Sequence, residues 1–174
     1  MTNPALRYGA RLSALWAVVF LGACGHELSA PTQQPASQFS ATVTGAFQIP
    51  LTGKAALITS PAGTLGSTPV PASSVLGLMD KNGTVVAFKW AGPPPIAGSY
   101  DIGLASNDIV MSYDQATGSP GSSFEGTTGT VIISSATDTY VSGTFFAAAT
   151  AQDTQARITV TGSFTAQVVP QTPM

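Results

Sequence analysis

The sequence has few charged residues. Lys, Arg, Asp and Glu make up 8% of its 174 residues, against roughly a quarter in an average soluble domain. The formal net charge is −2 and no cluster of bases is present, which argues against nucleic acid as a partner because phosphate binding needs concentrated positive charge. Hydrophobic residues make up 44% of the chain, more than disordered proteins usually contain. We therefore predict a folded domain that does not bind nucleic acid.

Histidine and cysteine occur once each, as His26 and Cys24. A single cysteine excludes a disulfide within the chain, and two such residues are too few for a zinc site of the His/Cys type. Because His26 lies two residues after Cys24 in a segment without apolar periodicity, it is a poor candidate for a positioned general base. We expect neither an enzyme nor a cofactor.

The acidic residues are the remaining candidates for chemistry. Paired carboxylates could serve a polysaccharide hydrolase, and Asn107, Asp108 and Asp114 could offer oxygens to calcium around one loop. However, most of the acids lie at predicted turns, where Asp commonly caps backbone amides. We favour this turn interpretation, with Asp108 and Asp114 as weak calcium candidates. The acids of the predicted domain are Asp80, Asp101, Asp108, Asp114, Glu125, Asp138 and Asp153.

The N-terminus has the organisation of a secretory signal. Arg7 and Arg11 precede an apolar run from Leu12 to Ala23. This run is shorter than the roughly 20 apolar residues that a membrane-spanning helix needs, and it matches the apolar core of a signal peptide. We predict a helical signal peptide over residues 1–23.

The end of this run, Leu21-Gly22-Ala23-Cys24, resembles the lipobox of bacterial lipoproteins. The resemblance implies that Leu21, Gly22 and Ala23 are recognised by signal peptidase II, which cuts before Cys24, and that Cys24 carries the lipid. An ordinary signal peptide cut after Ala30 is the alternative, but it would place Pro31 first, which the corresponding peptidases accept poorly. The resemblance predicts a protein of the bacterial cell envelope whose membrane partner is reached through acylated Cys24. In many Gram-negative bacteria an Asp directly after the lipidated Cys retains a lipoprotein in the inner membrane. Gly25 occupies this position here, which favours the outer membrane where the cell has one.

Residues 24–37 carry two prolines and no apolar period, which predicts a flexible tether. The β-domain is expected over residues 38–169 and a short tail over 170–174. Without the signal, the chain keeps eight acids and four bases, a formal net charge of about −4 that does not favour anionic lipid. Membrane association must then come from the acyl chains.

Alternating apolar and polar residues predict β-strands through most of the domain. One apolar stripe runs from Phe39 to Ile49, a second from Val141 to Ala149 and a third from Ile158 to Val168. Asp80–Gly83 has the form of a hairpin turn in which Asn-Gly supplies positive φ. We predict an all-β fold, an antiparallel sandwich or small barrel of about eight or nine strands. The further predicted strands are Lys54–Ser60, Val75–Met79, Thr84–Trp90, Ser99–Leu104, Ile109–Tyr113 and Gly129–Ser134.

A pattern V-[ST]-G-[AST]-F occurs three times, at Val43–Phe47, Val141–Phe145 and Val160–Phe164. Glycine weakens a strand, so on a buried face it indicates the close approach of another group such as an aromatic ring. A glycine floor for a ligand is the alternative. Trp90 shares a face with Val86 and Phe88, which predicts core packing rather than a recognition surface with the prolines that follow it.

The C-terminal segments Thr130–Ile133, Val141–Phe145 and Ile158–Phe164, with Pro95–Ile102, are similar to motifs of uncharacterised all-β bacterial lipoprotein families. Those families imply fold and location but no activity. The leading hypothesis is a non-enzymatic structural or partner-binding domain, with a protein or polysaccharide of the envelope as partner. A barrel that carries a small ligand is the second hypothesis, and a carboxylate-dependent polysaccharide hydrolase is the third.

Overall fold

The computed structural model describes residues 35–65, 67–103, 109–116 and 122–171. By its contacts the chain divides into two units, Met1–Gln34 and Pro35–Met174, and the fold described below is that of the second unit. The described residues form strands and turns, without a helix. The predicted signal helix lies outside the described residues.

The strands are joined mostly by short turns. Their bounds are β1 Gln38–Gly45, β2 Ile49–Ser60, β3 Gly63–Leu65, β4 Thr68–Val70, β5 Ser73–Asp80, β6 Val85–Ala91, β7 Gly98–Ile102, β8 Val110–Asp114, β9 Ser123–Ala136, β10 Tyr140–Ala151 and β11 Arg157–Pro170.

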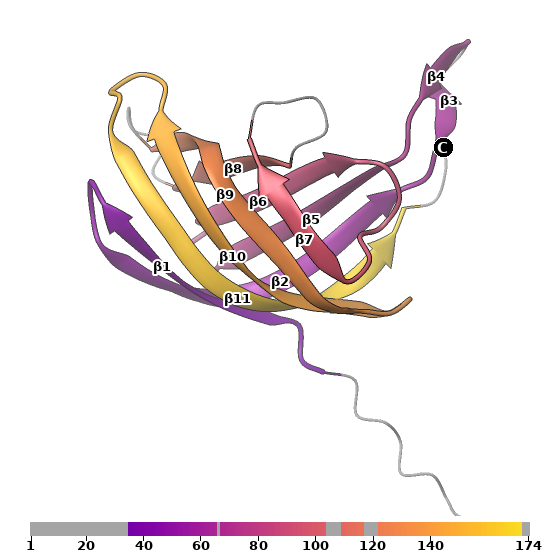
Figure 1. Ribbon diagram of the computed structural model, residues 1–174, viewed down its shortest axis with the longest axis horizontal. Helices are drawn as coiled ribbons and strands as arrows, with labels where there is room; N and C mark the ends of the chain where they lie inside the picture. Colours follow the sequence, from indigo (N-terminus) through magenta and orange to yellow (C-terminus); the bar gives the residue numbers. More distant parts are fainter. Residues whose placement is uncertain (1–34, 66, 104–108, 117–121, 172–174) are drawn as a thin grey trace, which may run out of the picture. The chain divides into compact units, whose positions relative to one another are not determined.

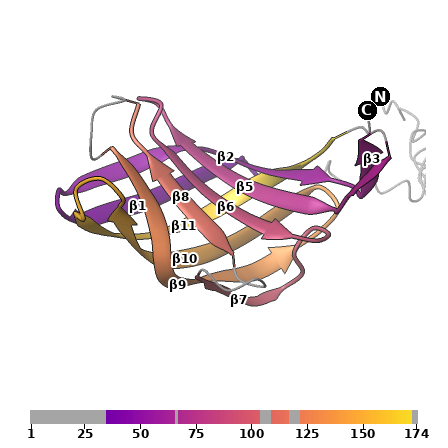
Figure 2. The ribbon, with the colours of Figure 1, turned by 90° about the horizontal axis from the view of Figure 1, so that it is seen from above.

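Eight of these strands close into an antiparallel barrel (Figures 1 and 2). Hydrogen bonding follows the order β10-β11-β1-β2-β5-β6-β8-β9, and β9 then pairs with β10 to complete the ring. The ninth strand, β7, pairs with the C-terminal half of β9, while β3 and β4 form a separate hairpin. The all-β antiparallel prediction is confirmed, and of the two architectures predicted the domain has the barrel.

The barrel has two different ends. The turn end carries the β1–β2, β5–β6, β8–β9 and β10–β11 connections. The hairpin end carries the β3–β4 hairpin, the β6–β7 loop, the β9–β10 turn and the end of β11. Strand β1 starts part of the way along the barrel. On the hairpin-end side of Gln38, its two neighbours β11 and β2 pair directly with each other, in parallel. The Ser37 hydroxyl donates a hydrogen bond to the Ala55 carbonyl oxygen at this junction.

The interior of the barrel is filled by side chains. Alternate residues of each barrel strand point inward and are buried, and large side chains such as Leu57, Leu76 and Phe88 have no exposed surface. The rings of Phe88 and Phe145 lie 5.0 Å apart between centroids. Trp90 is 8% exposed and stacks on Tyr100, which confirms its predicted place in the core.

Two copies of the V-[ST]-G-[AST]-F pattern pack against each other. In the β10–β11 register, Gly143 lies opposite Phe164 and Phe145 lies opposite Gly162. A Cβ on Gly162 would lie 2.7 Å from Cζ of Phe145, and one on Gly143 would lie 3.1 Å from Cζ of Phe164. Each glycine therefore leaves room for the aromatic ring of the other copy. The packing interpretation is confirmed for these two copies.

The third copy differs. The predicted apolar stripe is buried from Phe39 to Val43, but it does not continue in one strand to Ile49. β1 ends at Gly45, whose φ of 115° turns the chain. A Cβ at this glycine would lie 2.5 Å from the carbonyl oxygen of Arg157, so the turn requires the absence of a side chain. Phe47 consequently lies in the β1–β2 turn, with its ring centroid 6.0 Å from Tyr113 and 5.8 Å from Phe124.

Several strand bounds also depart from the predictions. β9 begins at Ser123 instead of Gly129, and the β3–β4 hairpin was not predicted because its prolines and glycines indicate a loop. The predicted β5–β6 turn is confirmed, with Gly83 at φ 83°.

Candidate functional site

The buried carboxylate Asp80 caps a turn. It is 7% exposed, and its Oδ1 accepts hydrogen bonds from the backbone N–H groups of Asn82 at 2.9 Å and Thr84 at 2.8 Å. The side-chain amide of Asn82 donates to Oδ2 at 3.2 Å. These bonds satisfy the buried carboxylate within the β5–β6 turn, as the turn interpretation predicts for this residue.

The other described acids are distributed over separate elements. Asp101 lies in β7 opposite Thr130, and Asp114, at the end of β8, accepts a 2.6 Å hydrogen bond from the hydroxyl of Ser123. Glu125 lies in β9, while Asp138 and Asp153 belong to turns at opposite ends of the barrel. Among the described residues, no three His, Cys, Asp or Glu side chains gather closely enough to hold a metal ion. Of the two calcium candidates, Asp114 is described, and Asp108 lies outside the described residues together with Asn107.

Tyr113 is the described group with the clearest electrostatic perturbation. Its side chain is fully buried beside Phe47 and Phe124, and its hydroxyl accepts a 3.3 Å hydrogen bond from Nε2 of Gln115. Burial raises the pKa of Tyr113 above its ordinary value of 10.0, the hydrogen bond from Gln115 opposes this rise, and the negative charge of Asp80 adds to it. The folded barrel therefore keeps this phenol neutral to a higher pH than the unfolded chain does.

This raised pKa predicts a loss of stability in alkali. Above about pH 10 the phenol of the unfolded chain releases its proton while the folded one keeps it, so the free energy of unfolding falls as pH rises toward the folded pKa. We expect Tyr113→Phe to flatten the decline in melting temperature between about pH 9.5 and 11.5. Thermal unfolding across this range checks it, with Tyr140→Phe as the control variant. An unchanged slope for Tyr113→Phe would contradict the assignment.

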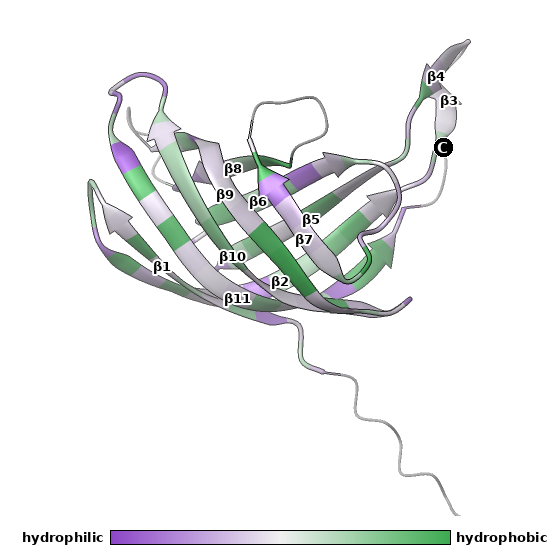
Figure 3. Cartoon of the chain, viewed as in Figure 1, coloured by the Kyte–Doolittle hydropathy of each residue, from purple (hydrophilic) through white to green (hydrophobic). Residues whose placement is uncertain are grey.

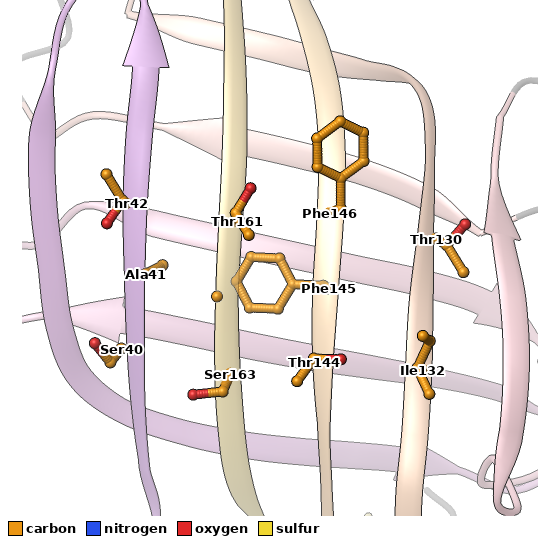
Figure 4. A pocket seen from close by; sticks show the side chains of 11 residues that line it. Ser40, Ala41, Thr42, Thr130, Ile132, Thr144, Phe145, Phe146, Thr161 and Ser163 are labelled. Atoms are coloured by element: carbon orange, nitrogen blue, oxygen red, sulfur yellow. The ribbon is translucent and has the colours of Figure 1, made fainter.

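The outer surface of β1, β11, β10 and β9 carries two rows of aligned side chains. One row runs from Ser40 through Ser163 and Thr144 to Ile132, and the neighbouring row from Thr42 through Thr161 and Phe146 to Thr130. We call these eight residues the hydroxyl face (Figure 4). Successive side chains of a strand point to opposite faces, so the residues that alternate with the buried ones place their hydroxyls on the outer surface of the barrel.

The hydroxyl face is hollowed above Gly162. The hollow has a volume of about 400 Å³ and is lined by the hydroxyl face together with Ala41, Phe145 and Gly162. Two further hollows of about 420 and 510 Å³ lie beside it, around Phe39–Ser40 and around Ala148–Thr150. The outer wall formed by these strands is therefore uneven, and the central hollow combines hydroxyls with aromatic surface.

The chemistry of this hollow is uncharged. Its lining holds no Lys, Arg, Asp, Glu or His, so it supplies neither an acid–base pair nor a charged clamp. Six hydroxyls can both donate and accept hydrogen bonds. The Phe146 ring, 51% exposed, and the Ile132 side chain, 49% exposed, offer apolar surface beside them. The lining therefore offers hydrogen bonds and apolar contact side by side.

The exposed Phe146 was not predicted from the sequence. The available signal was the pair Phe145-Phe146, because consecutive residues of a strand point to opposite faces. With Phe145 assigned to the buried stripe, its neighbour had to face outward. The apolar stripes predicted over Val141–Ala149 and Ile158–Val168 imply that Thr144 and Thr161 face outward, but the sequence does not show that β1 and β9 align further hydroxyls with them.

The predicted lipidation residues, Leu21, Gly22, Ala23 and Cys24, lie outside the described residues, as does His26. In the part of the chain that the structure describes, no helix is long and apolar enough to cross a membrane. No family model matches this chain, and it has no match among the curated proteins or the solved structures. The resemblance to uncharacterised lipoprotein families stays a prediction.

Proposed function

We propose that the protein is a bacterial envelope lipoprotein, held to the membrane by acylated Cys24, whose barrel binds a neutral polysaccharide on the hydroxyl face. It is a binding protein and not an enzyme. The observation that supports this most is the uncharged hollow above Gly162, with hydroxyls on both sides of the exposed Phe146 ring. The dispersed carboxylates support the non-enzymatic role.

The filled interior favours the outer surface over carriage of a ligand inside the barrel. Leu57, Leu76, Leu78, Val86 and Phe88 have no accessible surface, so no water-sized void adjoins their side chains. A carried ligand would have to displace these side chains from a packed core, which costs several kcal/mol of stability for each large residue moved. The hydroxyl face needs no such rearrangement.

A neutral sugar polymer suits this surface by its chemistry. A sugar ring has an apolar C–H face that packs on an aromatic side chain, and equatorial hydroxyls that exchange hydrogen bonds with Ser and Thr. Phe146 lies between Thr161 and Thr130 in its row, and Thr144 lies between Ser163 and Ile132 in the next. A protein partner is less well matched, because the centre of a protein interface is usually more apolar and richer in large side chains.

Phe146→Ala is expected to weaken polysaccharide binding at least about tenfold, equivalent to about 1.4 kcal/mol, because it removes the ring on which a sugar would stack. Affinity electrophoresis of the detergent-solubilised full chain measures this, in gels that contain dextran, mannan or galactomannan. The wild type should be retarded by at least one of these polymers.

Met79→Ala provides the matched control, because Met79 is 54% exposed but lies on β5, away from the hydroxyl face. This variant should migrate as the wild type does. Equal migration of the wild type with and without every polymer, or equal retardation of Phe146→Ala and wild type, would refute the binding proposal.

A further inference from the structure

The hairpin end of the barrel exposes an uncharged hairpin. β3 and β4 pair only with each other, and the described side chains of the hairpin, Val70 among them at 44%, are exposed. No charged residue occurs between Lys54 and Asp80, so the parts of β2 and β5 next to the hairpin are uncharged as well. A two-stranded hairpin that buries no face of its own is marginally stable in water, and its exposed apolar surface indicates an interaction.

Other apolar side chains are exposed at the same end. Ile96, in the β6–β7 loop, is 75% exposed. The Tyr100 hydroxyl fixes its backbone by donating to the Ile96 carbonyl at 2.9 Å and accepting from the Ile96 N–H at 3.1 Å. Ile58 and Val169, 36% and 42% exposed, lie opposite each other where β2 and β11 pair. Apolar groups from two connections and from the β2–β11 pair therefore lie at one end of the barrel.

The two ends of the barrel differ in charge. The β5–β6 and β10–β11 turns, with the end of β8, place charges at the turn end, namely Asp80, Lys81, Asp114, Asp153 and Arg157. At the hairpin end, Asp138 is the one charged residue in the described parts of the β2–β5, β6–β7 and β9–β10 connections, and the exposed Lys89 lies two residues before the end of β6. In Figure 3 the β3–β4 hairpin lacks the strong hydrophilic colour seen on the β10–β11 side. This asymmetry distinguishes an end suited to water from an end suited to an apolar surface.

The course of the chain also favours the hairpin end. β1 runs from Gln38 toward the turn end, so the first residue of β1 is directed toward the hairpin end. Between Cys24 and β1 the spacer can extend to roughly 45 Å, at about 3.3–3.6 Å per residue. This is long enough for the hairpin end to touch a membrane to which Cys24 is attached.

We infer that the hairpin end lies against the lipid surface, with Val70, Ile96 and the β3–β4 hairpin in the interfacial region of the bilayer. This inference rests on the lipidation in the proposed function. Acyl chains hold the protein at the membrane, and the uncharged end then fixes the orientation of the barrel. The formal charge of about −4 on the mature chain argues against attraction by anionic lipid, so the contact is an apolar one. It leaves the hydroxyl face on the side wall of the barrel, accessible from the solvent.

A single introduced cysteine tests the orientation. Ile96→Cys and, as the matched control, Met79→Cys at the turn end are made in the full chain, expressed with normal processing, and labelled with a thiol-reactive fluorophore. The proteins are reconstituted into phosphatidylcholine vesicles with and without lipid that carries a nitroxide quencher near the headgroup. We expect the Ile96 label to lose about half of its emission or more and the Met79 label about a tenth or less.

The wild type separates this inference from the lipidation on which it rests. If Cys24 is acylated, the wild type takes up no fluorophore, since its only cysteine is blocked. If the wild type takes up no label and the labels at Ile96 and Met79 are quenched equally, the inference is overturned and the lipidation stands. An unquenched Ile96 label, which would result if a second copy or another protein covered this end, has the same meaning. A wild type that takes up the label would refute the lipidation and remove the basis of the inference.

Discussion

Phe145→Ala is expected to lower the free energy of unfolding by about 3–5 kcal/mol, the usual cost of removing a buried aromatic ring. Its side chain is 3% exposed and lies between Phe88 and Phe164, with ring centroids 5.0 and 6.4 Å away. Its ring also occupies the space that a side chain at Gly162 would need, since a Cβ there would lie 2.7 Å from Cζ of Phe145. Urea unfolding followed by near-UV dichroism measures the loss.

The adjacent residue gives the control for this prediction. Phe146→Ala removes the same group from the outer face, where the ring is 51% exposed, and should change the free energy of unfolding by about 1 kcal/mol or less. A similar loss in both variants would contradict the assignment of these neighbours to opposite faces of β10. The two variants together therefore test which face of β10 points into the barrel, independently of any ligand.

Cys24→Ser is expected to abolish lipid attachment completely. Serine lacks the thiol to which a diacylglycerol is transferred in bacterial lipoproteins, and Cys24 is the only cysteine. Metabolic labelling with a fatty-acid analogue should fall to background, and the protein should leave the detergent phase on Triton X-114 partitioning. His26→Ala, a change in the predicted spacer, should keep both signals. Undiminished labelling or partitioning of Cys24→Ser would show that the membrane association has another origin.

The strands that pair locally were the most predictable part of the fold. Alternation around Val141–Ala149 and Ile158–Val168 identified β10 and β11, because a sheet with one buried face imposes a period of two on the sequence. The repeated pattern likewise predicted that its glycines approach aromatic rings. Gly143 lies against the ring of Phe164, and Gly162 lies against the ring of Phe145.

Features that depend on distant pairing could not be derived in this way. Alternation is the same in a sandwich and in a barrel, and the closure between β9 and β10 follows from the full arrangement of the sheet. The third glycine pattern gives a turn because Gly45 meets the backbone of Arg157, a contact between residues far apart in sequence. The hydroxyl face likewise depends on the register of β1 with β11 and of β9 with β10, which fixes which outward residues become neighbours.

Cys24 should become the acylated first residue of the mature protein, and intact mass spectrometry of the protein purified from bacterial membranes measures this. We expect a chain that begins at Cys24, with a mass increased by a diacylglycerol and, where the amine is also acylated, by a further fatty acid. A chain that begins at Met1 or Pro31, or an unmodified Cys24, would contradict it.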